Sequence, residues 1–302
     1  MENPEESTTS NEAAAAPARV RRMPMALVTW AFVVLILLIV VVLLVLKITR
    51  GATTVAPPPV APAPLDVVRQ VTSLPASVFD AVGTPDPNGP APTVLSGQPS
   101  LVVDGRPDVV YVGGEFCPYC AAERWVLVAA LGRFGTFSAL GATSSSKFEA
   151  FGDTPTFSFD GSRYRSRYVT FSATEEYGER PSTRAPAGFP VIEDLPSFEK
   201  ALFKRYDSAP FSSEPTALPF VDVANRLLVT GAGVGFSPEV LQGDSLGKVA
   251  SDLSDPTTTV AQAVLGAANE ITAAICSATD QVPKSVCKST GVLAAASRLG
   301  IG

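Results

Sequence analysis

The sequence predicts an α/β domain that follows a single N-terminal transmembrane helix and a proline-rich linker. The α/β class rests on the order of predicted elements after residue 100, where short β-rich runs alternate with helical stretches. A Cys-Pro-Tyr-Cys motif at residues 117–120 stands between the first buried strand and the first long helix. The transmembrane helix rests on an apolar run at residues 25–46 that contains no charged side chain.

The apolar run is long enough to cross a bilayer. Its 22 residues would form a helix of roughly 33 Å at about 1.5 Å per residue, which matches the hydrocarbon core. A cleaved signal peptide is the alternative, but its apolar region spans only about 7–15 residues and ends in a small-residue cleavage site. Here Lys47 and Arg50 follow the run directly. The sequence therefore predicts an uncleaved membrane anchor.

The charges that flank the anchor predict its orientation. Arg19, Arg21 and Arg22 precede the run, whereas Lys47 and Arg50 follow it. The positive-inside rule then favours a cytoplasmic N-terminus. We expect a single-pass protein of the cell membrane with a cytoplasmic tail at 1–24 and an extracytoplasmic main domain. The tail is rich in Glu, Ser and Ala and is predicted to be disordered.

A linker separates the anchor from the main domain. Residues 51–64 hold five prolines in fourteen positions, a composition typical of a semi-rigid, extended segment. The sequence thus divides into a tail at 1–24, a helix at 25–46, a linker at 47–64 and a domain at 65–302.

Composition excludes several classes of protein. The chain contains no histidine, which excludes a Ser/His/Asp triad, a Cys/His protease pair and a histidine-ligated metal. A net charge of −6 and a pI near 4.9 argue against a nucleic-acid partner. The basic residues Arg163, Arg165 and Arg167 alternate along a predicted strand. They form either a solvated face or a partner-binding patch.

The Cys-Pro-Tyr-Cys motif carries the chemistry. Residues 109–112 read as a buried strand, and residues 121–134 as a mostly buried helix. Cys117 then falls at a helix N-terminus, where unpaired backbone N–H groups and the helix dipole favour the thiolate and lower the pKa of its thiol. Pro118 suits the first helical turn, because its missing N–H costs nothing there.

The remaining elements complete the α/β order. We expect a strand at 136–144, a hairpin of 156–159 and 164–172 around Asp160-Gly161, a helix at 195–206, a hairpin of 218–223 and 227–230, and helices at 238–253 and 257–278.

These segments resemble a known family. The motif after a buried strand resembles the active site of the thioredoxin superfamily, and the chain is more closely similar to its membrane-anchored branch catalogued as domain of unknown function 929. The matching stretches lie at 119–125, 153–159, 218–222 and 271–276. The resemblance implies a thioredoxin-like domain with C-terminal helices, but no established reaction.

The superfamily resemblance also implies a cis-proline that faces the cysteine pair. Pro219 fits the order of strand, turn, strand and helix that follows it, whereas Pro155 also begins a β-like run and stands at a spacing nearer that of small thioredoxins. If Pro219 has this role, residues of about 148–206 form an insertion.

Two positions depart from the thioredoxin pattern. Tyr111 stands where a buried acid is expected, and Tyr119 precedes the second cysteine in place of histidine. The first removes a proton acceptor, and the second removes a cationic neighbour of the thiolate. Glu115 is either a proton carrier or an exposed surface carboxylate.

Cys276 and Cys287 form the other pair of cysteines. Ten residues that include Pro283 separate them, so the two can approach within disulfide range. A structural disulfide is the main interpretation and requires an oxidising compartment. A second redox pair and a zinc site of four cysteines are the alternatives, although the spacing is poor for zinc.

The motif predicts a thiol-disulfide oxidoreductase that acts on protein thiols or disulfides without a cofactor or a metal. The Cys117 thiolate would attack a disulfide of another protein, and Cys120 would resolve the mixed disulfide. A membrane electron carrier is a plausible redox partner. The alternative is a non-catalytic envelope binding or assembly module in which Cys117 and Cys120 form a permanent disulfide.

Overall fold

The computed structural model describes residues 25–49, 60–183, 185, 188–212 and 215–301. The chain divides into two compact units, residues 1–56 and 57–302. In the first unit the described part is α1 (Met25–Thr49). The predicted cytoplasmic tail at 1–24 lies outside the described residues. So does most of the predicted linker, at 50–59.

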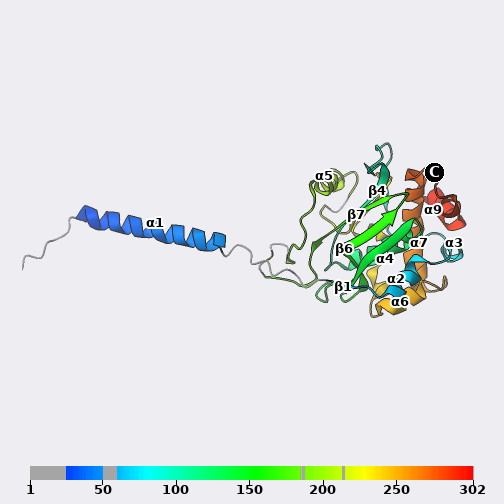
Figure 1. Cartoon of the computed structure of the whole chain (residues 1–302), viewed down its shortest axis with the longest axis horizontal. Helices are drawn as coiled ribbons and strands as arrows, with labels where there is room; N and C mark the ends of the chain where they lie inside the picture. Colours follow the sequence, from blue (N-terminus) through cyan, green and yellow to red (C-terminus); the bar gives the residue numbers. More distant parts are fainter. Residues whose placement is uncertain (1–24, 50–59, 184, 186–187, 213–214, 302) are drawn as a thin grey trace, which may run out of the picture. The chain divides into compact units, whose positions relative to one another are not determined.

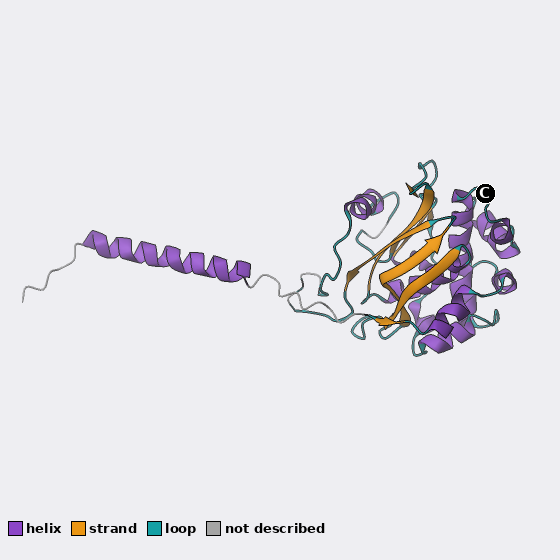
Figure 2. Ribbon diagram, in the orientation of Figure 1, coloured by secondary structure: helices purple, strands orange, loops and turns teal. Residues whose placement is uncertain are grey.

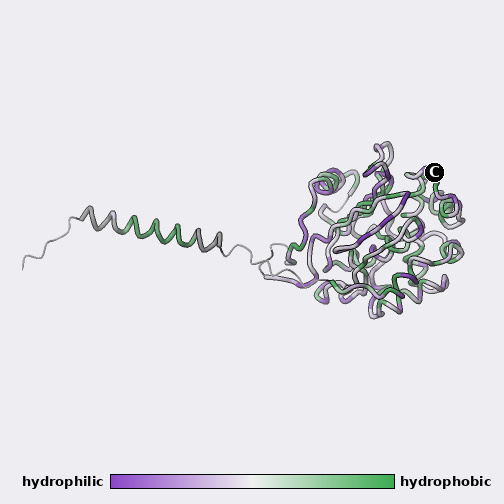
Figure 3. The backbone as a smooth tube through the Cα atoms, in the orientation of Figure 1, coloured by the Kyte–Doolittle hydropathy of each residue, from purple (hydrophilic) through white to green (hydrophobic). Residues whose placement is uncertain are grey.

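The helix α1 contains the apolar run predicted from the sequence. Its large side chains from Phe32 to Leu43 are exposed, and Figure 3 colours these turns as hydrophobic. Among the described residues, the helix that has both the length and the hydropathy of a membrane span is α7 (Thr259–Ala278). Within that span, 83% of the residues are buried, so α7 is a core helix of the second unit.

The second unit is built on a central sheet. The strands of the unit are β1 (Ala61–Pro62), β2 (Thr93–Val94), β3 (Val102–Val103), β4 (Arg106–Gly114), β5 (Gly135–Ser144), β6 (Pro155–Ser166), β7 (Thr170–Tyr177), β8 (Phe220–Val223) and β9 (Leu227–Thr230). The α-helices after α1 are α2 (Leu65–Thr72), α3 (Ala76–Val82), α4 (Pro118–Gly132), α5 (Ser197–Tyr206), α6 (Leu246–Asp252), α7, α8 (Lys284–Cys287) and α9 (Thr290–Leu299). Two 3₁₀ helices, η1 (Gly231–Val234) and η2 (Pro238–Leu241), follow β9.

The strand β4 lies at the centre of this sheet. It pairs in parallel with β7 and antiparallel with β8, so that Tyr111 stands opposite Ala173 on one side and Val221 on the other. The strand β9 continues the sheet beyond β8, and β2 pairs with β9. The turn between β8 and β9 contains Ala224 and Asn225, both with positive φ, which is the geometry of a tight hairpin.

Each face of β4 contributes to a separate core. Val109 and Tyr111 belong to the larger core, with residues of α4 and α7, whereas Val110 and Val112 pack with residues of α5. Figures 1 and 2 show the same layering, with α5 on the opposite side of the strands from α4 and α7. Because both faces are covered, the strand reads as a continuous apolar run.

The strands β5 and β6 form a long antiparallel pair outside this path, and β1 pairs with β5. The predicted hairpin around Asp160-Gly161 is wrong, because β6 continues to Ser166 along the same partner. Residues 159–162 bulge opposite Leu140, and a φ of 65° at Gly161 permits the bulge. The strand predicted at 136–144 is present as β5, and the parallel neighbour of β4 is β7.

Candidate active site

The motif lies where β4 passes into α4. Cys117 is the N-cap residue of α4, with φ −81° and ψ 122°, and Pro118 occupies the first helical turn. The backbone N–H of Cys120 donates a hydrogen bond to Sγ of Cys117, at 3.1 Å. The predicted position of Cys117 at a helix N-terminus is confirmed, and its sulfur satisfies one of the unpaired N–H groups of the helix.

The two thiols have opposite acidities. Burial raises the pKa of Cys117, but hydrogen bonds from the thiol and backbone N–H of Cys120 and the charge of Arg124 lower it by more, so its pKa lies below the usual value. Burial raises the pKa of Cys120 well above its usual value, and the hydrogen bond to Cys117 and the charge of the Cys117 thiolate act in the same direction. Cys117 is therefore the more acidic thiol of the pair and Cys120 the less acidic one.

The two cysteines also differ in access. Cys117 is 6% exposed and Cys120 is fully buried. The ring of Tyr119 lies edge-on to Phe151, at 6.4 Å between centroids. Cys117 is therefore the sulfur that another molecule reaches first, and its narrow exposure demands close contact.

Pro219 lies beside the cysteine pair. The Leu218–Pro219 peptide bond is cis, and the carbonyl oxygen of Leu218 lies 3.6 Å from Sγ of Cys117, within reach of its S–H. The other candidate, Pro155, is not among the cis prolines of the described residues. Its carbonyl oxygen accepts a hydrogen bond from Nε1 of Trp125, at 2.8 Å. Of the two prolines, the structure brings Pro219 to the pair.

A buried ion network lies under the start of α4. Arg124 and Glu175 are fully buried and form two hydrogen bonds, from Nε to Oε1 at 2.8 Å and from Nη2 to Oε2 at 2.6 Å. The hydroxyl of Tyr111 donates to Oε2 of Glu175, at 3.4 Å. The Tyr111 side chain also lies over Gly113, where an added Cβ would come within 2.0 Å of its hydroxyl oxygen.

The network supplies the two groups that Tyr111 and Tyr119 do not provide, a buried acid and a cation near the thiolate. Glu175 provides a buried carboxylate beside Tyr111, and Arg124 provides a cation one helical turn after Cys120. Sequence reasoning missed both residues. The four-residue spacing of Cys120 and Arg124, which puts them on one helix face, was the available signal for Arg124. Nothing local indicated Glu175, which lies 51 residues from Arg124.

Glu115 belongs to the same network and is not a surface carboxylate. It is 3% exposed, and the Ser158 hydroxyl donates a hydrogen bond to its Oε1. Its Oε2 lies 3.4 Å from Nη2 of Arg124. Burial raises the pKa of Glu115 to about 7, although Arg124 acts in the opposite direction.

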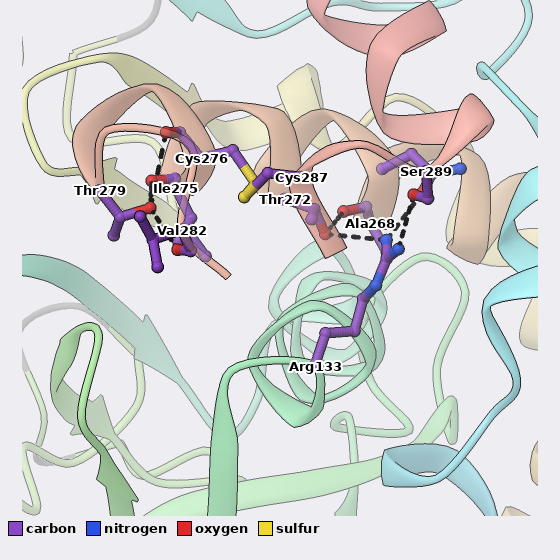
Figure 4. The surroundings of a disulfide bond; sticks show 10 residues. Arg133, Ala268, Thr272, Ile275, Cys276, Thr279, Val282, Cys287 and Ser289 are labelled. Atoms are coloured by element: carbon purple, nitrogen blue, oxygen red, sulfur yellow. Dashed lines mark hydrogen bonds between the residues drawn. A yellow bond between two sulfur atoms is a disulfide. The ribbon is translucent and has the colours of Figure 1, made fainter. Parts of the chain in front are cut away.

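Cys276 and Cys287 form a disulfide with a Cα–Cα distance of 5.5 Å. The bond joins the end of α7 to α8, and both cysteines are buried (Figure 4). Nearby, Arg133 from the end of α4 donates hydrogen bonds to Thr272 and Ser289, at 3.4 and 3.0 Å (Figure 4).

The disulfide uses two of the four sulfurs that a zinc site would need. Within the described part of the chain, no group of three or more Cys, Asp or Glu is suited to a metal ion.

The three arginines of the predicted stripe are exposed. Arg163 and Arg165 lie on β6 and Arg167 follows its end, whereas Tyr164 packs against the larger core and donates a hydrogen bond to the carbonyl of Leu131.

Comparison with known proteins gives one match. No curated protein and no solved structure matches the chain significantly. A family model described as Domain of unknown function (DUF929) matches residues 94–277, a segment that contains Cys117, Cys120, Pro219 and Cys276. Because this match covers more than half of the chain, the protein belongs to the DUF929 family.

Proposed function

We propose that this protein is a membrane-anchored, extracytoplasmic thiol-disulfide oxidoreductase that acts on protein disulfides through Cys117 and Cys120. The observation that carries the proposal is the asymmetry of the pair. Cys117 caps a helix, accepts the N–H of Cys120 and has a lowered pKa, whereas Cys120 is buried with a raised pKa. An acidic attacking thiol beside a protonated resolving thiol is the arrangement that exchange chemistry needs.

We further propose that the domain is thioredoxin-like. The strand order β7–β4–β8–β9, with β7 parallel and β8 antiparallel to β4, supports this fold. The cis-proline at the start of β8, opposite the cysteine pair, supports it independently. The topology favours the β5–β6 pair, residues 135–166, as the inserted segment instead of residues 148–206. The latter range contains β7, a strand of the central sheet.

The reaction follows from the two acidities. The Cys117 thiolate attacks one sulfur of a substrate disulfide, forms a mixed disulfide and releases the other sulfur as a thiolate, which takes a proton from solvent. Cys120 then loses its proton, attacks Sγ of Cys117 and releases the second substrate thiol. The substrate gains two electrons and the Cys117–Cys120 disulfide holds the oxidised equivalent. In reverse, the same pair donates its disulfide.

The membrane location is part of the proposal. The exposed apolar side chains of α1 from Phe32 to Leu43 suit a lipid environment. The Cys276–Cys287 disulfide supports an oxidising, extracytoplasmic compartment for the domain, because thiols stay reduced in the cytosol. A membrane electron carrier would then restore the pair.

Covalent trapping tests the function. In Cys120→Ser the mixed disulfide cannot be resolved, so Cys117 should accumulate bonded to a substrate protein or to a model disulfide peptide. Cys117→Ser is the matched control and should trap nothing. If Cys120→Ser forms no mixed disulfide with any disulfide substrate, the oxidoreductase proposal fails.

A non-catalytic binding module is the second candidate, and the 6% exposure of Cys117 favours it. In that case Cys117 and Cys120 would form a permanent disulfide that resists reduction. Thiol titration after mild reduction separates the two functions. A Cys117 thiol that appears readily and titrates below about pH 8.5 supports the enzyme, whereas a bond that stays inaccessible supports the module.

A further inference from the structure

Glu115 is a buried carboxyl two residues before Cys117 with one unsatisfied oxygen. Its Oε1 accepts the hydrogen bond from Ser158, but its Oε2 has no hydrogen-bond partner among the described residues. That oxygen faces Nη2 of Arg124 at 3.4 Å. The charge of Glu115 is therefore balanced mainly by Arg124.

Arg124 is shared between two carboxyl groups, and its charge also lowers the pKa of both cysteines. The same Nη2 donates to Oε2 of Glu175, at 2.6 Å, and to the carbonyl of Gly114, at 3.0 Å. When Glu115 is ionised, one guanidinium faces two carboxylates and the network has a net negative charge. When Glu115 is protonated, the network is neutral and a thiolate at Cys117 is less strongly opposed.

A cavity lies beside Glu115 and apart from the cysteine pair. It has a volume of about 220 Å³, and Glu115 lies in its wall. Neither Cys117 nor Cys120 lines it. The charged or titratable groups that face Glu115 across the network and the cavity are Arg124 from α4, Glu175 from β7, Asp160 from β6, Tyr111 from β4, and Glu179 and Arg180 after β7.

We propose that Glu115 is a positioning residue that couples reduction of the Cys117–Cys120 disulfide to uptake of a solvent proton, acting through Arg124. This inference rests on the proposed oxidoreductase function. An external dithiol supplies two electrons, breaks the Cys117–Cys120 bond and becomes a disulfide itself. Cys120 takes one proton and Cys117 remains a thiolate. Its negative charge favours a second proton on Glu115, so two protons enter with two electrons.

The pH dependence of the redox equilibrium tests this coupling. The full chain in detergent is equilibrated with dithiothreitol redox buffers at pH 6 and pH 8, for the natural protein and for Glu115→Gln. The pKa of Glu115 is about 7, so its carboxyl is protonated at pH 6. The equilibrium constants for reduction of the Cys117–Cys120 disulfide should then agree within about twofold between the two proteins. At pH 8 the constant of the variant should be about tenfold larger, which corresponds to a reduction potential about 30 mV more positive.

Two further variants make the test specific. Glu179→Gln removes a carboxylate from the same cavity, but no ion pair links Glu179 to Arg124 in the described residues, so its redox equilibrium should follow that of the natural protein. Ser158→Ala keeps the carboxyl and removes the hydrogen bond that lowers the pKa of Glu115. It should move the pH dependence to higher pH, and it serves if Glu115→Gln does not fold.

The outcomes separate the inference from the function. If Glu115→Gln and the natural protein have the same redox equilibrium at both pH values, or if Glu179→Gln has as large an effect, the role of Glu115 is refuted while the oxidoreductase stands. If the cysteine pair forms no reversible disulfide in any buffer, the proposed function fails first, and the inference falls with it.

Discussion

Arg124 and Glu175 form a two-point ion pair with no exposure to solvent, joined by bonds of 2.8 and 2.6 Å. The pair links α4, which carries the cysteines, to β7, the parallel neighbour of β4. The pair therefore anchors the helix to the sheet and holds in place the Arg124 charge, which lowers the pKa of both cysteines. The first prediction tests the anchoring.

Replacing Glu175 with leucine should strongly destabilise the domain. The change leaves the Arg124 charge buried with only Glu115 to balance it, and breaking a buried pair from one side costs about 3–5 kcal/mol. Urea unfolding of the full chain measures the loss. The double variant Arg124→Leu/Glu175→Leu should recover part of the stability, because no buried charge remains. A single variant as stable as the natural protein would contradict this account, and Lys248→Ala in the exposed pair with Asp252 is the control.

Alkylation should discriminate between the two thiols of the reduced protein. At pH 7 we expect iodoacetamide to modify Cys117 about tenfold faster than an unperturbed cysteine, because the lowered pKa of its thiol increases the share of thiolate. Cys120 should react only after unfolding, since it is fully buried with a raised pKa. Mass spectrometry locates the label. Faster labelling of Cys120 in the folded protein would reverse the assigned roles.

Glu123→Gln should stabilise the domain at neutral pH. Glu123 is buried in α4 with one unpaired oxygen, and burial together with the charge of Glu270 raises its pKa well above the usual value. Because the folded state holds this proton more tightly than the unfolded state, stability falls as the pH rises above about 4.5. The free energy of unfolding of the variant should not decrease in this way and should exceed that of the natural protein near pH 7. Urea unfolding at several pH values measures both.

The neighbouring acid provides the control for that prediction. Glu270 forms an ion pair with Arg298, so Glu270→Gln removes a favourable charge pair and should not stabilise the domain. If Glu123→Gln is less stable than the natural protein at every pH, the Glu123 carboxyl stabilises the domain, and the prediction is wrong.

Removal of the second disulfide should cost stability and spare exchange. The bond closes a loop with a sequence separation of 11, for which loop entropy predicts about 3 kcal/mol. The double variant Cys276→Ala/Cys287→Ala should unfold at lower urea while Cys117 still forms mixed disulfides. A loss of trapping in a folded double variant would instead favour an electron-transfer role for this pair.

Local patterns were sufficient for much of this molecule. The apolar run of β4, the helix start at Cys117 and the hairpin turn at Asn225 depend on neighbours in sequence, so their residue types predicted them. The Cys276–Cys287 pairing was also accessible, because its partners are close along the chain. The misplaced turn at Asp160-Gly161 has a local cause as well, since a bulge and a hairpin turn use the same glycine conformation.

The sequence by itself determined that an acidic cysteine would begin a buried helix after an apolar strand, because capping and helix dipole act within one turn. Only the tertiary structure decided which strand flanks β4, which proline faces Cys117 and that Glu115 is buried against Arg124. These features depend on contacts between segments far apart in the chain, such as Arg124 with Glu175, 51 residues away, and Cys117 with Leu218, 101 residues away. Burial by distant segments sets the electrostatics of the site, and no local pattern encodes it.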